Sequence, residues 1–443
     1  MYVQDFGMIE KNTVITECGA RFHIFKTDKF KMSRLSINFI LPADADRSPV
    51  TRLMLATMMR GCSKYPTVTK INKKLDELYG ATVTWRPVSV GERHIFKISC
   101  EMLSNKYRFE GDTESIVLEV CRVVLDILLN PLLDDNGLLP KSHFESEKKL
   151  AIDAIRAKIN DQKAYAADQC HKLMFGDSPL GITTEGSVEQ IENITLEDVS
   201  GNIEYFLEHS MLECYYVGND EMDDVVELVG EAFAPYKDVD KYKLTNERAF
   251  LRESEGSVHE RCDVMDVSQS RFNIGYTSGI VMSDEDYHAM CLFNEIFGGS
   301  SVGKLFLNVR EKQSLCYYCY SSYHSATGVI MVGCGIKAEN RDLAFREIEN
   351  QLEEMRAGNI SDDEIRTAKR TVISGLKQMS DSPSATEAFH FRRYLATVEE
   401  SAEECAAKIE SVTLEEIVAV AQKVRLDTVY FLMGENEEDE YDE

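Results

Sequence analysis

The segment from Gly298 to Ser321, GGSSVGKLFLNVREKQSLCYYCYS, contains two short patterns that could carry chemistry. Its first seven residues fit G-x-x-x-x-G-K, in which backbone N–H groups and a lysine bind nucleotide phosphates. Such a loop also needs a buried strand before it and a hydroxyl after it to hold magnesium. Here HAMCLFNEIF precedes the glycines with helical spacing, and Leu305 stands where the hydroxyl is needed. The sequence therefore argues against nucleotide binding.

Cys316 and Cys319 form the second pattern, C-x-x-C, which in a loop would indicate zinc binding or redox chemistry. The surrounding LCYYCYSSY alternates as a strand does, and positions three apart on a strand point to opposite faces. We therefore expect two buried or half-buried thiols. His143 and Glu147 lie one helical turn apart, but no second histidine stands near them in the sequence, so they do not predict a metal site.

The elements that could position a site are predicted from their capping signals and breakers. Ser48 supplies an N-cap and Pro49 the first helical position, and the following residues run without a breaker to Gly61. This predicts a helix of about three turns over residues 50–60. A second helix is predicted at residues 68–79. The turn between the two helices reads GCSKYPT.

This helix pair, followed by LDELYGA, resembles a segment of the insulinase/pitrilysin (M16) zinc peptidases. In that family the first helix carries H-x-x-E-H, whose histidines bind zinc while the glutamate deprotonates a bound water. The resemblance puts Arg52 and Ala56 at the two histidines and Leu55 at the glutamate. The family's third ligand, a glutamate on a later helix, falls on Ala154 in FESEKKLAIDAI. The resemblance thus implies that the zinc site is degenerate and that this chain binds no metal.

The segment that begins at Gly298 is similar to the M16 pattern GGxxSSRLFxxVRExxgLaYxxxS. In active relatives the arginine and tyrosine of this pattern reach the substrate backbone beside the scissile bond. The matching residues here are Arg310 and Tyr317, which the resemblance identifies as substrate-binding residues. An arginine fork and a phenol are suited to polarising a peptide carbonyl or its oxyanion. The alternative is that both residues only support the fold, at a helix end and in a strand.

Keeping the arginine and tyrosine while losing the zinc ligands resembles the non-catalytic subunit of two-component bacterial M16 systems. The resemblance implies that the chain binds and positions a peptide or protein substrate and completes the site of a zinc-bearing M16 partner. A heterodimer with that partner, or a homodimer, is expected, with zinc in the partner subunit and no activity in this chain alone. One alternative is a purely structural or assembly role without any part in proteolysis. Another is a stand-alone enzyme with an unrecognised site.

The chain contains the same unit twice. IENITLEDV at 191–199 and IESVTLEEI at 409–417 each carry a threonine N-cap with an acid three residues later, and each leads into a helix and a terminal strand. We predict an α+β fold of two homologous halves, each a mostly antiparallel sheet packed against helices, which the resemblance arranges as a clam. The predicted parts are a first domain, a charge-rich linker, a second domain and an acidic tail: 1–236, 237–262, 263–434 and 435–443.

The composition narrows the classes of partner. The formal net charge of −27 argues against a nucleic-acid-binding surface. No apolar run reaches the length of a membrane span. The N-terminus, MYVQDFGMIEKNT, has neither the basic nor the apolar region of a secretory leader. Together with twelve cysteines, these features predict a reducing, cytoplasmic location.

Overall fold

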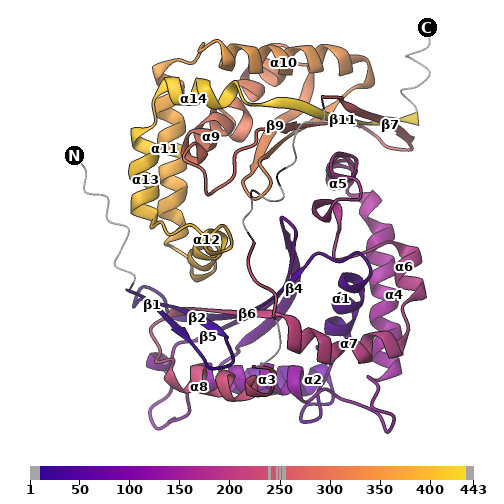
Figure 1. The fold of residues 1–443 in the computed structure, drawn as a ribbon, viewed down its shortest axis with the longest axis vertical. Coiled ribbons are helices and arrows are strands. Elements are labelled where there is room, and N and C mark those ends of the chain that lie inside the picture. Colours follow the sequence, from indigo (N-terminus) through magenta and orange to yellow (C-terminus); the bar gives the residue numbers. More distant parts are fainter. Residues whose placement is uncertain (1–9, 238–240, 246–247, 249–250, 252–255, 436–443) are drawn as a thin grey trace.

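The computed structural model describes residues 10–237, 241–245, 248, 251 and 256–435, which form two sheets that are each covered by helices (Figure 1). The strands of the first sheet are β1 Glu10–Ile15, β2 Arg21–Lys26, β3 Met32–Pro42, β4 Thr82–Val90, β5 Arg93–Leu103 and β6 Met211–Gly218. Those of the second are β7 His259–Met265, β8 Ser270–Thr277, β9 Cys316–His324, β10 Val329–Ile336 and β11 Arg425–Gly434. The predicted α+β class is confirmed.

The two sheets share one topology. The order β2-β6-β3-β5-β4 in the first sheet matches β7-β11-β8-β10-β9 in the second, and β1 is an additional edge strand. In each sheet one pair is parallel, β2 with β6 and β7 with β11, while the other matched pairs are antiparallel. Strand β7 begins at His259, inside the stretch predicted as a linker. Of the predicted acidic tail, only Glu435 lies within the described residues.

Helices cover one face of each sheet and form a separate apolar core with it. The first core includes Phe39, Phe96 and Phe206, and the second includes Phe272 and Phe297. The helices of the first half are α1 Arg47–Met58, α2 Val68–Glu77, α3 Ile116–Leu129, α4 Lys141–Ala157, α5 Gln162–Phe175, α6 Val188–Asn193, α7 Leu196–His209 and α8 Asp223–Ala232. Those of the second are α9 Tyr287–Asn294, α10 Arg341–Arg356, α11 Asp362–Met379, α12 Pro383–Leu395, α13 Ala402–Ser411 and α14 Leu414–Ala421.

Two of the predicted helix starts are confirmed and one is wrong. Thr195 and Thr413 both cap their helices in reciprocal capping boxes. By contrast, Ser48 does not cap α1, because its hydroxyl lies 2.6 Å from Nδ1 of His94. The helix begins at Arg47, two residues before the predicted first helical position, and the backbone N–H of Arg47 donates to the carboxylate of Asp44 over 2.8 Å. An aspartate three residues before the helix start thus takes the capping role that the sequence suggested for the serine.

Two helices cross from one half to the other. Helix α5 packs against β8 and β11 of the second sheet, and α12 packs against β3 and β6 of the first (Figure 1). One helix of each half therefore packs against the sheet of the other half. Among the described residues, no helix is long and apolar enough to cross a membrane.

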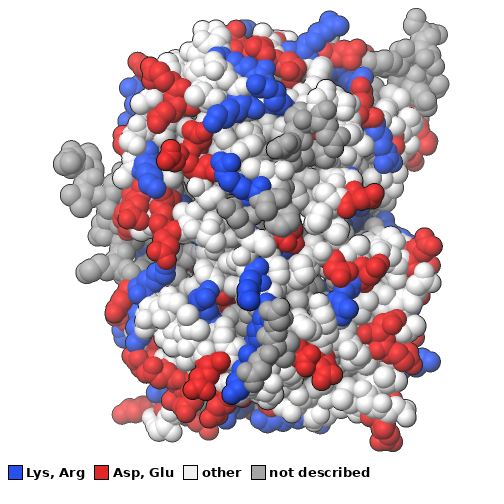
Figure 2. Space-filling model, in the orientation of Figure 1, with Lys and Arg blue, Asp and Glu red and all other residues white. Residues whose placement is uncertain are grey.

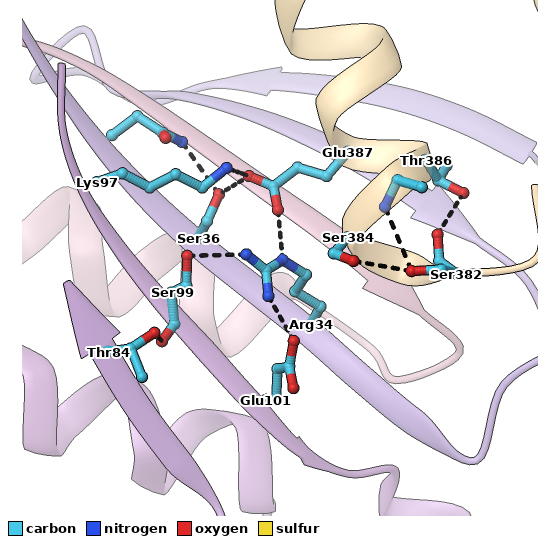
Figure 3. Close-up of polar contacts among 12 residues, drawn as sticks. Arg34, Ser36, Thr84, Lys97, Ser99, Glu101, Ser382, Ser384, Thr386 and Glu387 are labelled. Atoms are coloured by element: carbon cyan, nitrogen blue, oxygen red, sulfur yellow. Dashed lines mark hydrogen bonds and ion pairs between the residues drawn. The ribbon is translucent and has the colours of Figure 1, made fainter. Parts of the chain in front are cut away.

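Helix α12 is tied to the first sheet by a buried ionic network around Glu387, whose side chain is fully enclosed (Figure 3). Its Oε2 accepts a hydrogen bond from Nε of Arg34 over 2.5 Å, and its Oε1 accepts from Ser36 and Lys97. A second branch of Arg34 donates to Glu101 over 2.6 Å. Buried charges persist only when they are paired in this way. The sequence pattern did not predict this contact, because Arg34 and Ser36 lie 353 and 351 positions before Glu387.

The Glu387 network makes a prediction about acid stability. Burial alone would raise the pKa of Glu387, but Lys97 and Arg34 hold it below its ordinary value of 4.5. A carboxylate with a depressed folded-state pKa stabilises the protein above its unfolded-state pKa, and this contribution disappears as the pH falls through the folded value. The chain should therefore lose stability below about pH 4.5, and a Glu387→Gln variant should lose less over the same range. Urea midpoints at several pH values would measure the difference, and equal slopes would contradict it.

Candidate functional site

Three of the four residues assigned to the degenerate zinc site line one cavity. Helix α1 packs against α4, and a hollow of about 360 Å³ beside them is lined by Arg52, Ala56 and Ala154. Trp85 of β4 forms part of the same wall. Leu55 is different, because it is fully buried in the first core and is not among the residues that line the cavity. Helices α1 and α4 thus bring Arg52, Ala56 and Ala154 to one cavity, whereas Leu55 lies in the core.

The residues of this cavity do not fit a zinc ion. Alanine offers no ligand atom at positions 56 and 154, and the guanidinium of Arg52 is a fixed cation. Its Nη1 is buried without a hydrogen-bond partner among the described residues. Glu147 also lines the cavity, but its Oε1 accepts from Nη1 of Arg60 over 2.6 Å. The cavity thus presents a cation, Arg52, and its carboxylate, Glu147, already pairs with Arg60. Both features disfavour zinc binding.

If the alignment is right, three substitutions should recreate the zinc site. The triple variant Arg52→His, Ala56→His, Ala154→Glu presents two imidazoles and one carboxylate toward the same cavity, and we expect it to bind about one zinc ion per chain. Peptidase activity should not appear, because Leu55 still stands where the base would be. Metal content after dialysis measures the result. In the control, Lys149→Glu on the exposed face of α4 replaces the Ala154 change; equal zinc in both variants, or in neither, would contradict the alignment.

One other cluster brings together potential metal ligands among the residues that the structure describes: His288, Glu400 and Cys405. Here Glu400 already pairs with Nη2 of Arg393 at 3.1 Å and with Nζ of Lys408 at 2.9 Å. Burial alone would raise the pKa of Glu400, but His288, Lys408 and Arg393 lower it to about 2. Burial raises the pKa of the Cys405 thiol to about 12, so it stays protonated. A cation entering this cluster would meet two resident cations.

Arg310 and Tyr317 line a second, separate cavity of about 470 Å³. Its wall also contains the charged side chains of Glu311, Lys337 and Glu339. The two cavities share no lining residue, since the first is built wholly from the first half and the second wholly from the second half. Within this chain the arginine and tyrosine are therefore not part of the hollow that contains the degenerate zinc positions.

Two backbone irregularities position this pair. Arg310 lies in a π-helical segment, η7 Leu305–Lys312, and such segments occur frequently at functional sites. In the β9–β10 ladder Tyr318 pairs with Gly335 but Cys316 pairs with Ile336, so Tyr317 is an extra residue in a β-bulge. The corresponding β4–β5 ladder of the first half keeps one register throughout. The bulge turns Tyr317 outward, where it is 57% exposed.

The bulge also corrects the prediction about the C-x-x-C pattern. Cys316 and Cys319 are both buried, as expected, but they lie on the same face of β9 and contact each other, because the extra residue shifts the alternation by one. The lysine of the phosphate-loop-like pattern, Lys304, is held by the carbonyl of Asn359 at 2.9 Å and by Glu364 at 2.8 Å. The ammonium of Lys304 thus makes contacts within the fold instead of extending toward a ligand.

Comparisons with known proteins agree with this architecture. Residues 193–372 match the family model described as the peptidase M16 inactive domain. A Bacillus subtilis protein described as a probable inactive metalloprotease, YmfF, is 29% identical over 422 residues, covering 94% of this chain and 96% of that protein. An uncharacterized zinc protease of Streptomyces coelicolor is 24% identical over 308 residues, covering 68% of this chain and 65% of that protein.

Solved structures share the fold over nearly the whole chain. A conserved protein from Enterococcus faecalis superimposes with a TM-score of 0.87 at 25% identity, covering 96% of this chain and 99% of that one. A protein from Pseudomonas fluorescens, described as a peptidase M16 inactive domain, superimposes with a TM-score of 0.77 at 17% identity, covering 96% and 98% of the two chains. At that identity the second likeness concerns the fold alone.

Proposed function

We propose, from the premise that the chain is an inactive M16 peptidase-like protein, that it binds a peptide or protein substrate and completes the active site of a zinc-bearing M16 partner. In this proposal Arg310 and Tyr317 contact the substrate backbone, and the partner supplies the metal and the base. The chain itself performs no hydrolysis. A guanidinium and a phenol can together donate hydrogen bonds to a carbonyl oxygen as it gains charge.

The observation that carries the proposal is the position of Tyr317. A large aromatic residue that is more than half exposed gains little from burial, so the core does not account for it. It reaches that position through a bulge that its counterpart ladder lacks, and it shares a cavity with Arg310. Bulges commonly re-aim a side chain beside an active site. A purely structural role would not account for an exposed tyrosine on a bulge beside Arg310.

The separation of the two cavities supports completion between chains. If the arginine and tyrosine acted on a metal site, that site would have to come from a second molecule, because their own chain presents Arg52 and alanines in a different hollow. A heterodimer with a zinc-bearing homologue satisfies this requirement, and a homodimer does not supply the metal. The proposal includes a cytoplasmic location, which the twelve free thiols support because disulfides are rare in that compartment.

Co-purification with a zinc-bearing M16 homologue from the same genome tests the proposal. We expect no zinc and no peptidase activity in this chain alone, and about one zinc ion per heterodimer together with peptide cleavage that needs both chains. The matched comparison is the partner alone, which should retain zinc but cleave slowly. Full activity of the partner without this chain, or stoichiometric zinc in this chain alone, would refute the proposal.

A further inference from the structure

A cavity lined by both halves of the chain takes no part in the proposed function. It has a volume of about 840 Å³ and lies between the two halves. Strands β1, β2 and β6 of the first sheet form one wall, while α12 with the loop after it forms another, and residues 241–244 contribute to the lining. It shares no residue with the cavity of Arg310 or with that of Arg52. Pockets of this size usually bind small molecules or short peptide segments.

The buried acids of this cavity are already satisfied by the fold. Glu213 lies 2.8 Å from Nε2 of His23, accepts from the hydroxyl of Tyr394 over 2.6 Å and is 3.3 Å from Nη1 of Arg21. Burial raises the pKa of Glu213 to about 8, against the opposing charge of Arg21, so that near neutral pH this carboxyl offsets the charge of Arg21 only in part. Glu400, also in the lining, is paired with Arg393 and Lys408, as described above.

Apart from the exposed carboxylate of Glu399, the remaining charged side chains of the cavity are positive. Lys241 donates to the backbone carbonyl of Cys18 over 2.8 Å, a neutral acceptor that does not cancel its charge. Lys11 forms no ion pair with a described residue. The histidines respond to this field: burial lowers the pKa of His23 to about 3, aided by Arg21 and Lys11, and that of His390 to about 4, aided by Lys11 and Arg393. The whole chain has a net charge of −27, and its acidic side chains spread over both halves in Figure 2. The excess of positive side chains in this cavity is therefore opposite in sign to the charge of the whole chain.

The walls between these charges are aromatic. The ring of His390 stacks on Phe25 with centroids 4.3 Å apart, and that of His23 stacks on Tyr215 at 4.4 Å. Tyr242 also lines the cavity. The hydroxyl of Tyr215, on a residue only 1% exposed, has no hydrogen-bond partner in the part of the chain that the structure describes. An unpaired buried hydroxyl is unfavourable. A ligand for this cavity would therefore present an apolar body to the rings and an anionic group to the lysines.

We propose that the cavity between the halves binds an organic anion in which a carboxylate is attached to an aromatic or aliphatic body. Lys11, Lys241 and Arg21 hold the carboxylate, and Phe25, Tyr215 and Tyr242 enclose the apolar part. The carboxylate belongs either to a free small acid or to the C-terminus of a peptide. Because the chain alone contains every residue involved, this inference does not depend on a partner subunit.

Calorimetry on the full chain tests the proposal with two matched pairs of probes. The first pair is 3-phenylpropanoate and 3-phenylpropanamide, and the second is acetyl-Gly-Leu-Phe with a free carboxylate and the same peptide as its amide. We expect each carboxylate to bind at least about tenfold more tightly than its amide, the difference that one charge-assisted contact supplies. Tighter binding of the tripeptide than of the small acid would identify a peptide C-terminus, and the opposite order a free acid.

A variant pair connects binding to this cavity. The double substitution Lys11→Gln, Lys241→Gln should remove the preference for the carboxylate, while Lys73→Gln, on the exposed face of α2, should leave it unchanged. In selectively labelled protein, a bound carboxylate should also raise the pKa of His23 and His390, because an anion favours their charged forms. Equal affinity for acids and amides, no binding of either probe pair, or a preference that survives the double substitution would overturn the proposal.

Discussion

Replacing Glu387 with alanine should lower the free energy of unfolding by about 3–5 kcal/mol. The substitution removes the carboxylate that accepts from Arg34 and Lys97, two cations that are themselves mostly enclosed (Figure 3). Lys97 would then remain between α12 and the first sheet without its carboxylate partner, and Arg34 would keep only the half-exposed Glu101. Breaking a buried ion pair on one side is more destabilising than replacing the whole pair, because the remaining charge keeps its desolvation penalty. Urea unfolding followed by the fluorescence of Trp85, the single tryptophan, measures the change.

Ser384→Ala is the matched control, since Ser384 lies on the same helix but is exposed (Figure 3). It should change the unfolding free energy by no more than about 0.5 kcal/mol. Glu387 is on α12, in the second half, whereas Trp85 is in the first half. A shift of the Trp85 unfolding transition in Glu387→Ala would therefore also show that the network couples the two halves. A Glu387→Ala effect as small as that of the control would mean that the network does not hold the halves together.

The elements with strong local signals could be predicted from the sequence. Both predicted threonine capping boxes form, because a side chain three residues away fixes each helix start whatever the tertiary structure does. The predicted start of α1 was two residues too late, because Ser48 has a tertiary partner, His94, that competes with capping. Contacts of this kind join distant positions, and a local pattern does not contain them.

In the candidate site, too, local patterns could be predicted from the sequence and features that depend on tertiary structure could not. The motif spacing brought Arg52, Ala56 and Ala154 into one cavity, since helix periodicity determines which residues share a face. The bulge at Tyr317 was not predictable, because strand alternation assumes an unbroken register and one extra residue inverts it. The only local indication of the bulge is the spacing of three apolar or small residues, Cys316, Cys319 and Ser321. The first two are three positions apart and the last two are two apart, whereas an unbroken strand would keep a spacing of two. The cavity between the halves could not be predicted at all, since its walls come from both ends of the chain.

Replacing Arg310 with alanine should lower the partner-dependent peptidase activity by about 10²–10³-fold, the usual effect of removing one oxyanion-stabilising donor. Tyr317→Phe, which removes a hydroxyl and keeps the ring, should lower it in the same direction. Lys312→Ala is the control, because Lys312 lies on the same helical segment and is exposed but does not line the cavity. Cleavage of a fluorogenic peptide by the reconstituted heterodimer gives the rates, and the affinity of the two subunits is measured alongside.

This result would separate substrate binding from a structural role because Arg310 contributes little to the fold. Its side chain is 39% exposed, its nearest carboxylate, Glu311, is 3.6 Å away, and it lies over the ring of Phe306 at 4.6 Å. Exposed pairs of this kind are worth less than about 1 kcal/mol. The variant should therefore fold and assemble normally. A loss of activity with unchanged subunit affinity would then come from the contact with substrate, whereas full activity in Arg310→Ala would leave an assembly role as the function of this chain.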